Sequence, residues 1–212
     1  MKLHQIRDDY QKDALLRATL EPNPILQFEK WFSEAVSKGC DKPNAMVIST
    51  VSADGQPRGR VVLLKETTKN GFVFFTNYNS IKGEQIQANS KASFCFYWTE
   101  LERQVIVEGT LSKLNRIQNE AYFRSRPFDS QINAVISAQS QLVATRLSLL
   151  QAAEELKHTL TEGELPECPQ EWGGYILIPQ RVEFWQGRPD RLHDRFIYTP
   201  SGSSWTTDRV AP

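Results

Sequence analysis

Hydrophobic residues first recur with helical spacing after the segment Pro22-Asn23-Pro24. Asn23 suits a helix N-cap, and Pro24 suits the first helical turn. The apolar positions that follow lie mostly three or four residues apart and are Ile25, Phe28, Phe32, Ala35 and Val36. Gly39 is a typical residue at which a helix stops. The pattern therefore predicts a helix between Pro24 and Gly39.

From residue 45 the pattern changes to short runs rich in β-branched and aromatic residues, which favour strands. Asp54-Gly55 and Asn70-Gly71 are turn signals between such runs. The predicted strands are AMVISTVS at 45–52, RGRVVLLK at 58–65, FVFFT at 72–76, SFCFYW at 93–98 and RQVIVEGTL at 103–111. A short helical piece separates the third from the fourth. We expect these five strands to form an antiparallel meander.

The pattern is helical again over residues 115–160, most clearly at leucines 147, 150, 156 and 160, and Gly163 and Pro166 end it. Three or four further strands are predicted around 174–179, 181–187, 194–198 and 204–208. Strands and helices do not alternate regularly, which predicts an α+β protein, mainly β, built on an antiparallel sheet or barrel. We expect residues 1–22 to be a flexible N-terminal arm and residues 23–212 a single domain.

Composition excludes several classes of partner. Lysine plus arginine number 25, and so do aspartate plus glutamate, so no net charge draws the chain to nucleic acid. No apolar run approaches the roughly 18 residues of a membrane span, and the charged N-terminus lacks a secretory signal. We therefore expect a cytoplasmic protein that binds neither nucleic acid nor membranes. Any anion must be held by a local cluster of cations.

Cysteine and histidine spacing gives little support for a metal site. The three cysteines, Cys40, Cys95 and Cys168, are far apart and form no CxxC pair, and the three histidines are isolated from one another. We expect reduced cysteines, with Cys95 in the core of its strand. The chain also lacks GxGxxG, P-loop and GxSxG motifs, which excludes the chemistries that depend on them.

The segment WQGRPDRLHDR, residues 185–195, is the strongest candidate for function. Two arginines, a histidine and an aspartate lie within RLHDR, and burying them without a ligand or partner would be costly. Flanking cations should lower the pKa of His193 and keep its ring neutral. Trp185 fits a core position as well as ring contact with a cofactor, and His193 also fits a satisfied structural histidine.

Other cationic and amide residues stand near strand ends and turns. Each one alone fits a solvated surface charge, although arginine and lysine are also the usual ligands of phosphate. Arg126-Pro127 fits a helix end, and Gln139-Ser140 fits a helix cap.

Read together, these segments resemble the pyridoxine/pyridoxamine 5′-phosphate oxidase family over nearly the whole chain. The motifs that carry the resemblance are RVVLLK at 60–65, FFTN at 74–77, LERQV at 101–105, YFRSRPFDSQI at 122–132, SAQS at 137–140, EWGG at 171–174, EFWQG at 183–187, RLHDR at 191–195 and the final DRVAP. The resemblance implies an FMN-binding split barrel, a Greek-key β-barrel with flanking helices. It also implies a homodimer with two FMN sites at the subunit interface.

The resemblance implies a set of site residues as well. The FMN-binding residues would be Arg60, Val61, Val62, Leu63, Leu64, Lys65, Phe75, Thr76, Lys82, Gln104, Gln139, Ser140, Trp185 and Arg195. The substrate-binding residues would be Lys65, Tyr122, Arg126, Ser130, Arg191, Leu192 and His193, with Arg7 and Tyr10 of the arm closing over the substrate. Arg191 and His193 would act in catalysis by orienting the substrate and contacting its 4′ amine or hydroxyl.

The implied reaction transfers a hydride from the 4′ carbon of the phosphorylated pyridoxine or pyridoxamine to FMN. Oxygen then reoxidises the flavin and gives hydrogen peroxide, and the amine substrate also releases ammonia. Two alternatives from other classes are a non-catalytic binder of flavin or pyridoxal phosphate, and a split-barrel reductase that takes electrons from a nicotinamide.

Three features need explanation. Ile81 stands where the family commonly has a second basic residue beside Lys82, which predicts weaker FMN retention. Asp8-Asp9 make the arm more acidic than is usual in the family. Arg60 and Lys65 are an odd number of residues apart, so in one regular strand they would face opposite sides. Either a bulge separates them or one acts from beyond the strand end.

Overall fold

A computed structural model describes residues 9–212. Its strands are β1 (Ala45–Val51), β2 (Pro57–Leu63), β3 (Glu66–Thr68), β4 (Gly71–Asn77), β5 (Lys91–Trp98), β6 (Arg103–Lys113), β7 (Trp172–Gln186), β8 (Asp194–Ser201) and β9 (Ser204–Arg209). Its α-helices are α1 (Pro24–Ser37), α2 (Ile81–Ala88), α3 (Arg116–Ser125), α4 (Phe128–Ile136) and α5 (Arg146–Thr159). Short 3-10 turns lie at Arg17–Thr19, Thr99–Leu101 and Pro189–Arg191.

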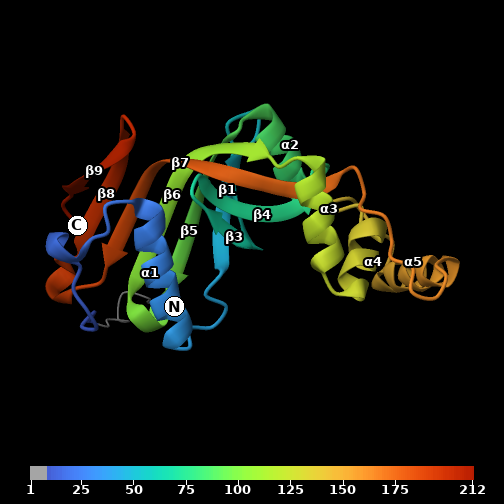
Figure 1. The fold of residues 1–212 in the computed structure, drawn as a ribbon, viewed down its shortest axis with the longest axis horizontal. Coiled ribbons are helices and arrows are strands. Elements are labelled where there is room, and N and C mark those ends of the chain that lie inside the picture. The colour runs from blue at the N-terminus through green and yellow to red at the C-terminus, as the bar shows by residue number, and fades with distance from the viewer. Residues whose placement is uncertain (1–8) are drawn as a thin grey trace, which may run out of the picture.

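In this part of the chain all strands join one antiparallel sheet in the order β2-β1-β5-β6-β7-β4-β3, and β8 and β9 extend from β7. The sheet is strongly curled (Figure 1). The predicted meander is wrong, because β4 pairs with β3 and β7, whereas β1 pairs directly with β5. The neighbours of β4 are the three-residue β3 and the much later β7, and a pairing across so many residues leaves no local signal in the sequence.

β7 is a single strand where the sequence predicted two, at 174–179 and 181–187. Glu108 of β6 faces Arg181 and Gly109 faces Pro179, so Gln180 is an extra residue in β7. This β-bulge changes which side chains face the core: Tyr175 and Leu177 do so before it, and Val182 and Phe184 after it. Pro179 and the change in the alternation of buried side chains at the bulge made the sequence look like two separate strands.

The predicted first helix is confirmed and covers the core face of the sheet. Asn23 caps it by accepting a hydrogen bond from the Ile25 N–H at 2.8 Å. The ring of Phe28 packs 5.0 Å from Phe72 and 4.8 Å from Phe96. The expectation that Cys95 lies in the core is wrong. Its neighbours Phe94 and Phe96 face the core, so Cys95 points to the opposite, partly exposed face.

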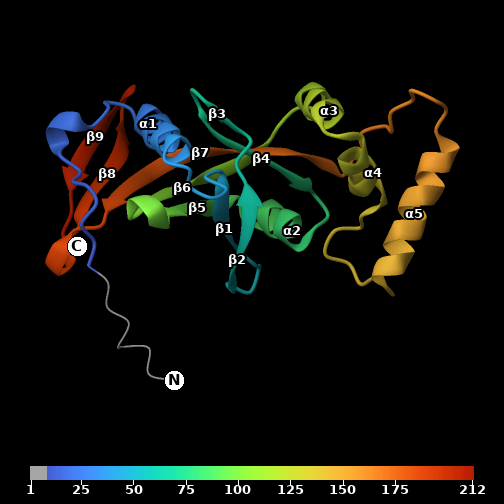
Figure 2. The same cartoon turned by 90° about the horizontal axis from the view of Figure 1, so that it is seen from below.

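The helical stretch after residue 115 forms three helices at one end of the molecule, whereas β8 and β9 lie at the other end (Figures 1 and 2). Arg126 follows the last residue of α3, as its fit to a helix end suggested. Gln139 and Ser140 do not cap a helix. They lie in the loop before α5, whose N-cap is Thr145. No helix in residues 9–212 has both the length and the apolar character to cross a membrane.

Candidate active site

Arg60 lies in β2 with its guanidinium held by two neutral side chains. Its Nη1 donates to Thr50 Oγ1 at 2.5 Å, and its Nη2 donates to Gln85 Oε1 at 3.1 Å. Thr50 is in β1, directly beside β2, and Gln85 is in α2. The strand pair and the helix together fix the direction of the Arg60 side chain.

Lys82 is on the first turn of α2 and faces the same region. Its Nζ donates to Gln139 Oε1 at 2.7 Å and to Thr76 Oγ1 at 3.1 Å. Thr76 Oγ1 also donates to Gln139 Oε1 at 2.9 Å. Gly83 allows this turn to pack closely, because a Cβ there would lie only 2.0 Å from the Tyr78 carbonyl oxygen. The structure thus brings together four predicted residues: Arg60, Thr76, Lys82 and Gln139.

The electrostatics of this cluster favour an anion. Burial, and then the charge of Arg60, lower the pKa of Lys82 to about 8. Burial also lowers the pKa of Arg60, with a smaller contribution from Arg58. Among the described residues, the charged groups that act on Arg60 and Lys82 are therefore other cations rather than carboxylates. Two partly buried cations without a carboxylate are costly, and a bound phosphate would offset that cost.

A second cationic position lies beside a stack of aromatic rings. Phe75 stacks on Tyr122 with centroids 3.8 Å apart, and it also stacks on Trp172 at 5.4 Å. The guanidinium of Arg126 lies 4.7 Å from the Trp172 ring. Its Nη1 is buried and has no hydrogen-bond partner within residues 9–212, and burial lowers the Arg126 pKa. This orphaned donor also suits an anionic ligand. Ser130 follows in the first turn of α4.

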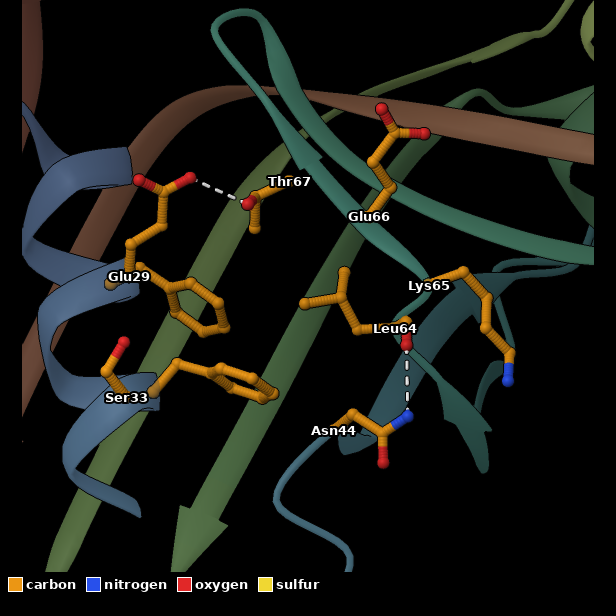
Figure 3. A pocket seen from close by; sticks show the side chains of 9 residues that line it. Glu29, Ser33, Asn44, Leu64, Lys65, Glu66 and Thr67 are labelled. Carbon is orange, nitrogen blue, oxygen red and sulfur yellow. Dashed lines mark hydrogen bonds between the residues drawn. The ribbon is translucent and has the colours of Figure 1, made fainter. Parts of the chain in front are cut away.

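Lys65 lies beyond the end of β2, which ends at Leu63. The rule that residues an odd number apart face opposite sides of a strand therefore does not apply to Arg60 and Lys65. Its backbone N–H donates to the Val73 carbonyl at 2.9 Å, and its side chain is exposed. A cavity of about 440 Å³ between α1 and β3 has Leu64 and Lys65 in its lining, with Phe28 and Phe32. In Figure 3 the Lys65 side chain points away from Glu29 and Ser33 of α1, on the opposite side of the cavity. This cavity therefore does not gather the predicted site residues.

Val61 and Leu63 expose their side chains on the outer face of β2, whereas Val62 and Leu64 turn toward the interior. The alternation is that of a regular strand, and it leaves two apolar side chains of the predicted FMN set on the surface of one copy.

A third group forms where the N-terminal arm meets the end of β7. The Tyr10 ring lies 5.4 Å from the Trp185 ring and 5.5 Å from the His193 ring, edge-on to both. Trp185 and His193 are 4.7 Å apart. Gly187 permits this packing, because a Cβ there would lie 2.6 Å from the Tyr10 ring. Arg7 falls outside the described residues.

His193 is held as a hydrogen-bond acceptor. The backbone N–H of Arg188 donates to its Nδ1 at 3.1 Å. Burial, followed by the charges of Arg191 and Arg195, lowers its pKa below the usual 6.5. The predicted direction is confirmed, although burial contributes more than the flanking cations. A neutral ring with Nδ1 accepting carries its proton on Nε2.

The RLHDR segment is only partly paired within the chain. Arg195 donates through Nε and Nη2 to Glu183 Oε1, each at 2.8 Å, and Asp194 binds Arg209 at 2.6 Å. Arg191 and Leu192 are exposed, and Arg191 has a positive φ of 60°. Arg195 lies opposite Trp185 in β8, and Gln104 lies opposite Trp185 in β6. Trp185 is partly exposed rather than a core residue.

One copy of the chain does not assemble the whole predicted site. The groups around Lys82 and Arg126 lie near α2, α3 and α4, whereas the group around Trp185 lies toward β8, at the other end of the molecule (Figure 1). Sequence reasoning missed Gln85, Thr50 and Trp172. Gln85 stands three residues after Lys82 in a helix, a spacing that places both on one face and could have identified it. Thr50 had no comparable signal.

Comparisons with known proteins show the family of this chain. The family model described as pyridoxamine 5′-phosphate oxidase matches residues 32–160. The model described as the pyridoxine 5′-phosphate oxidase C-terminal dimerisation region matches residues 172–212. A pyridoxine/pyridoxamine 5′-phosphate oxidase of Paraburkholderia phymatum is 46% identical over 99% of both chains. One from Actinobacillus pleuropneumoniae is 46% identical over 100% of both.

Two solved structures share the fold. PhzG from Burkholderia lata, in complex with tetrahydrophenazine-1-carboxylic acid, superposes with a TM-score of 0.88 at 28% identity and covers 94% of this chain and 98% of its own. An FMN-binding protein of Nostoc punctiforme, related to pyridoxamine 5′-phosphate oxidase, has a TM-score of 0.73 at 16% identity and covers 92% and 100%. The curled antiparallel sheet is thus the split barrel of these proteins.

Proposed function

The chain belongs to the pyridoxine/pyridoxamine 5′-phosphate oxidase family, and on that premise we propose that it converts pyridoxamine 5′-phosphate and pyridoxine 5′-phosphate to pyridoxal 5′-phosphate. FMN is the cofactor and oxygen the final electron acceptor. The products besides pyridoxal 5′-phosphate are hydrogen peroxide and, from the amine, ammonia.

The observation that carries the proposal is the presence of two separate cationic positions that, within residues 9–212, are not paired with a carboxylate. Arg60 and Lys82 form one, and Arg126, whose buried Nη1 has no partner in this part of the chain, forms the other. A protein that only binds FMN needs one phosphate pocket. An enzyme that brings FMN to a phosphorylated substrate needs two.

The residues present fit FMN. Arg60 and Lys82 would hold its phosphate, with Thr76 and Gln139 as hydrogen-bonding neighbours. Gln139 lies beside Ser140, which has a positive φ of 74° in the loop before α5. From a second copy, Trp185, Gln104 and Arg195 would contact the flavin. Donors of this kind stabilise negative charge on the reduced ring.

The substrate phosphate would be bound by Arg126 with Lys65, Tyr122 and Ser130. Arg191 and His193 would orient the other end of the substrate. His193 is neutral and carries its proton on Nε2. It can therefore donate a hydrogen bond from Nε2 to the 4′ substituent of the substrate without placing a positive charge beside it. FMN, when bound, would supply the acceptor for the hydride and the route by which its two electrons reach oxygen. The main task of the side chains is therefore to hold the 4′ carbon of the substrate roughly 3–3.5 Å from the flavin atom that accepts the hydride.

The chain acts as a homodimer, and residues 172–212 match the family's dimerisation region. These residues include Trp185, Arg191, His193 and Arg195. A two-fold dimer can bring this end of one copy against the Lys82 end of the other, which would complete two equivalent sites.

The test is an anaerobic reduction. FMN-loaded protein is mixed with pyridoxamine 5′-phosphate, and the visible flavin absorbance is followed before oxygen is admitted. We expect bleaching by the substrate and recovery with stoichiometric hydrogen peroxide. Bleaching by NADPH but not by the substrate would indicate a nicotinamide-fed reductase, and bleaching by neither would indicate a binding protein.

A further inference from the structure

Arg60 differs from the other well-paired arginines of the described chain in the kind of group that holds it. Arg103 binds Asp13 and Glu34, Arg195 binds Glu183, and Arg181 binds Glu108 and Glu183. Arg60 instead donates to a hydroxyl and an amide oxygen. Both kinds of acceptor orient a guanidinium, but only a carboxylate cancels its charge.

The acceptor group is built into the interior. Gln85 is 5% exposed and Thr50 is fully buried. Thr50 Oγ1 accepts from Arg60 Nη1 and donates its own proton to Gln85 Oε1 at 2.6 Å. Gln85 Oε1 thus accepts two hydrogen bonds, one from Thr50 Oγ1 and one from Arg60 Nη2. The triangle of hydrogen bonds fixes the guanidinium from two directions with no ionised partner.

Gln85 also lies on the helix face that carries Lys82, because the two are three residues apart in α2. Arg60 binds Gln85, and Lys82 lies one turn before Gln85 in α2, so both cations lie beside the same helix face. A carboxylate at position 85 would stand beside both and would repel a phosphate dianion bound there.

We propose that Gln85 is a positioning residue for recognition of the FMN phosphate, and that its neutrality matters as much as its hydrogen bond. It aims Arg60, with Thr50, and leaves the full positive charge of Arg60 and Lys82 to the phosphate. This inference rests on the proposed function, since it takes FMN as the ligand of this cluster.

The experiment compares FMN with riboflavin, which lacks the phosphate. Protein stripped of flavin is titrated with each, and binding is followed by flavin fluorescence. The variants are Gln85→Glu, which keeps an acceptor but adds a charge, and Gln85→Met and Thr50→Val, which remove hydrogen bonds at similar size. Gln87→Glu, on the exposed side of the same helix, is the matched control. Thermal unfolding of each flavin-free variant reports on the fold.

For Gln85→Glu we expect the FMN dissociation constant to rise about tenfold or more, with riboflavin within about twofold, because the added carboxylate cancels the charge of Arg60 and repels the phosphate. Gln85→Met and Thr50→Val should weaken FMN selectively but less. Gln87→Glu should leave both constants unchanged. Combined with Arg60→Met, the Gln85→Met change should have no further effect.

Equal weakening of FMN and riboflavin would show that Gln85 only supports the fold, and unchanged FMN binding would also overturn the inference. If Gln85→Glu fails to fold, Gln85→Met and Thr50→Val decide the question by the ratio of their FMN and riboflavin dissociation constants. If the unmodified protein binds neither flavin, the proposed function fails together with the inference. If it binds FMN normally and the variants do too, only the inference fails.

Discussion

Lys82 titrates close to physiological pH, which makes phosphate binding sensitive to pH. Its pKa in the flavin-free protein is about 8. A bound phosphate favours the charged lysine and raises that pKa, so FMN binding takes up a proton at and above pH 8. The FMN dissociation constant should therefore rise with pH from about 8 upward, by up to about tenfold per pH unit.

This is measured by FMN titrations between pH 7 and 9.5, with riboflavin as the ligand that lacks a phosphate. Lys82→Arg provides the control, because arginine stays charged throughout this range and should flatten the profile. An unchanged slope in Lys82→Arg would assign the titration to another group.

Ile81 begins α2 beside Lys82 and is 39% exposed. The family resemblance predicts a second basic residue at this position, so we expect Ile81→Arg to add a cation next to the phosphate. We expect the FMN dissociation constant to fall about two- to fivefold, the range of a solvent-exposed ion pair. Ile81→Gln, of similar polarity but no charge, should change it much less. An FMN affinity in Ile81→Arg equal to that of the unmodified protein contradicts the prediction.

Single residues also show what sequence alone could predict about the site. The family motifs predicted roles for Arg126 and His193, because these residues lie in the segments YFRSRPFDSQI and RLHDR. They did not reveal that Arg60 relies on Thr50, since that contact depends on the pairing of β1 with β2 in register. Nor did they reveal the unpartnered Nη1 of Arg126, because burial of one atom is set by packing around Trp172.

The N-terminal segment, α1, β6 and β7 are joined through one buried side chain. Arg103 of β6, 6% exposed, binds Asp13, Glu34 of α1 and Gln186 of β7, and it covers the Trp31 ring at 4.4 Å. The side chains of Asp13 and Glu34 are 54% and 41% exposed. If Arg103 were removed, water could therefore replace part of the hydrogen bonding that these two carboxylates would lose.

We predict that Arg103→Met lowers the free energy of unfolding by about 2–3 kcal/mol, less than for a fully buried ion pair, because methionine keeps the apolar contact with Trp31. Denaturation in guanidinium chloride measures this, with Arg146→Met on the exposed start of α5 as the comparison. Should both variants unfold at the same denaturant concentration, the Arg103 bridges contribute no net stability.

Elements were predictable where a local signal was strong. The cap at Asn23 and the hairpin of β1 with β2 follow from neighbouring residues. The pairing of β4 with β7 does not, because the two strands are about a hundred residues apart and their contact is set by the closed shape of the core. Likewise, Leu147 and Leu150 follow a helical pattern in α5 but are exposed, and only Ala153 of that helix is buried.

At the level of the dimer, the separation of the two groups of site residues gives a sharp prediction. One copy with Arg126→Ala is paired with one copy with His193→Ala by purification on two different tags. Each substitution alone should inactivate a homodimer. In the mixed dimer one site combines both defects and the other has none, so turnover should be about half that of the unmodified dimer.

The matched control places both substitutions in one copy and pairs it with an unmodified copy. Each site then receives one defect, and turnover should be lost. A site contained within a single copy would give the reverse: the first mixed dimer inactive and the second half-active. Flavin content is measured in both, so that loss of FMN is distinguished from loss of turnover.

The extra residue at Gln180 has a consequence for symmetry. Trp172 and Trp185 are thirteen positions apart in β7, an odd separation that would place them on opposite faces of a regular strand. Because Gln180 is an extra residue in the strand, they instead share the face opposite Tyr175 and Phe184, with Trp172 buried beside Phe123 and Trp185 partly exposed. β7 therefore presents a tryptophan near each of its two ends on the same face of the sheet.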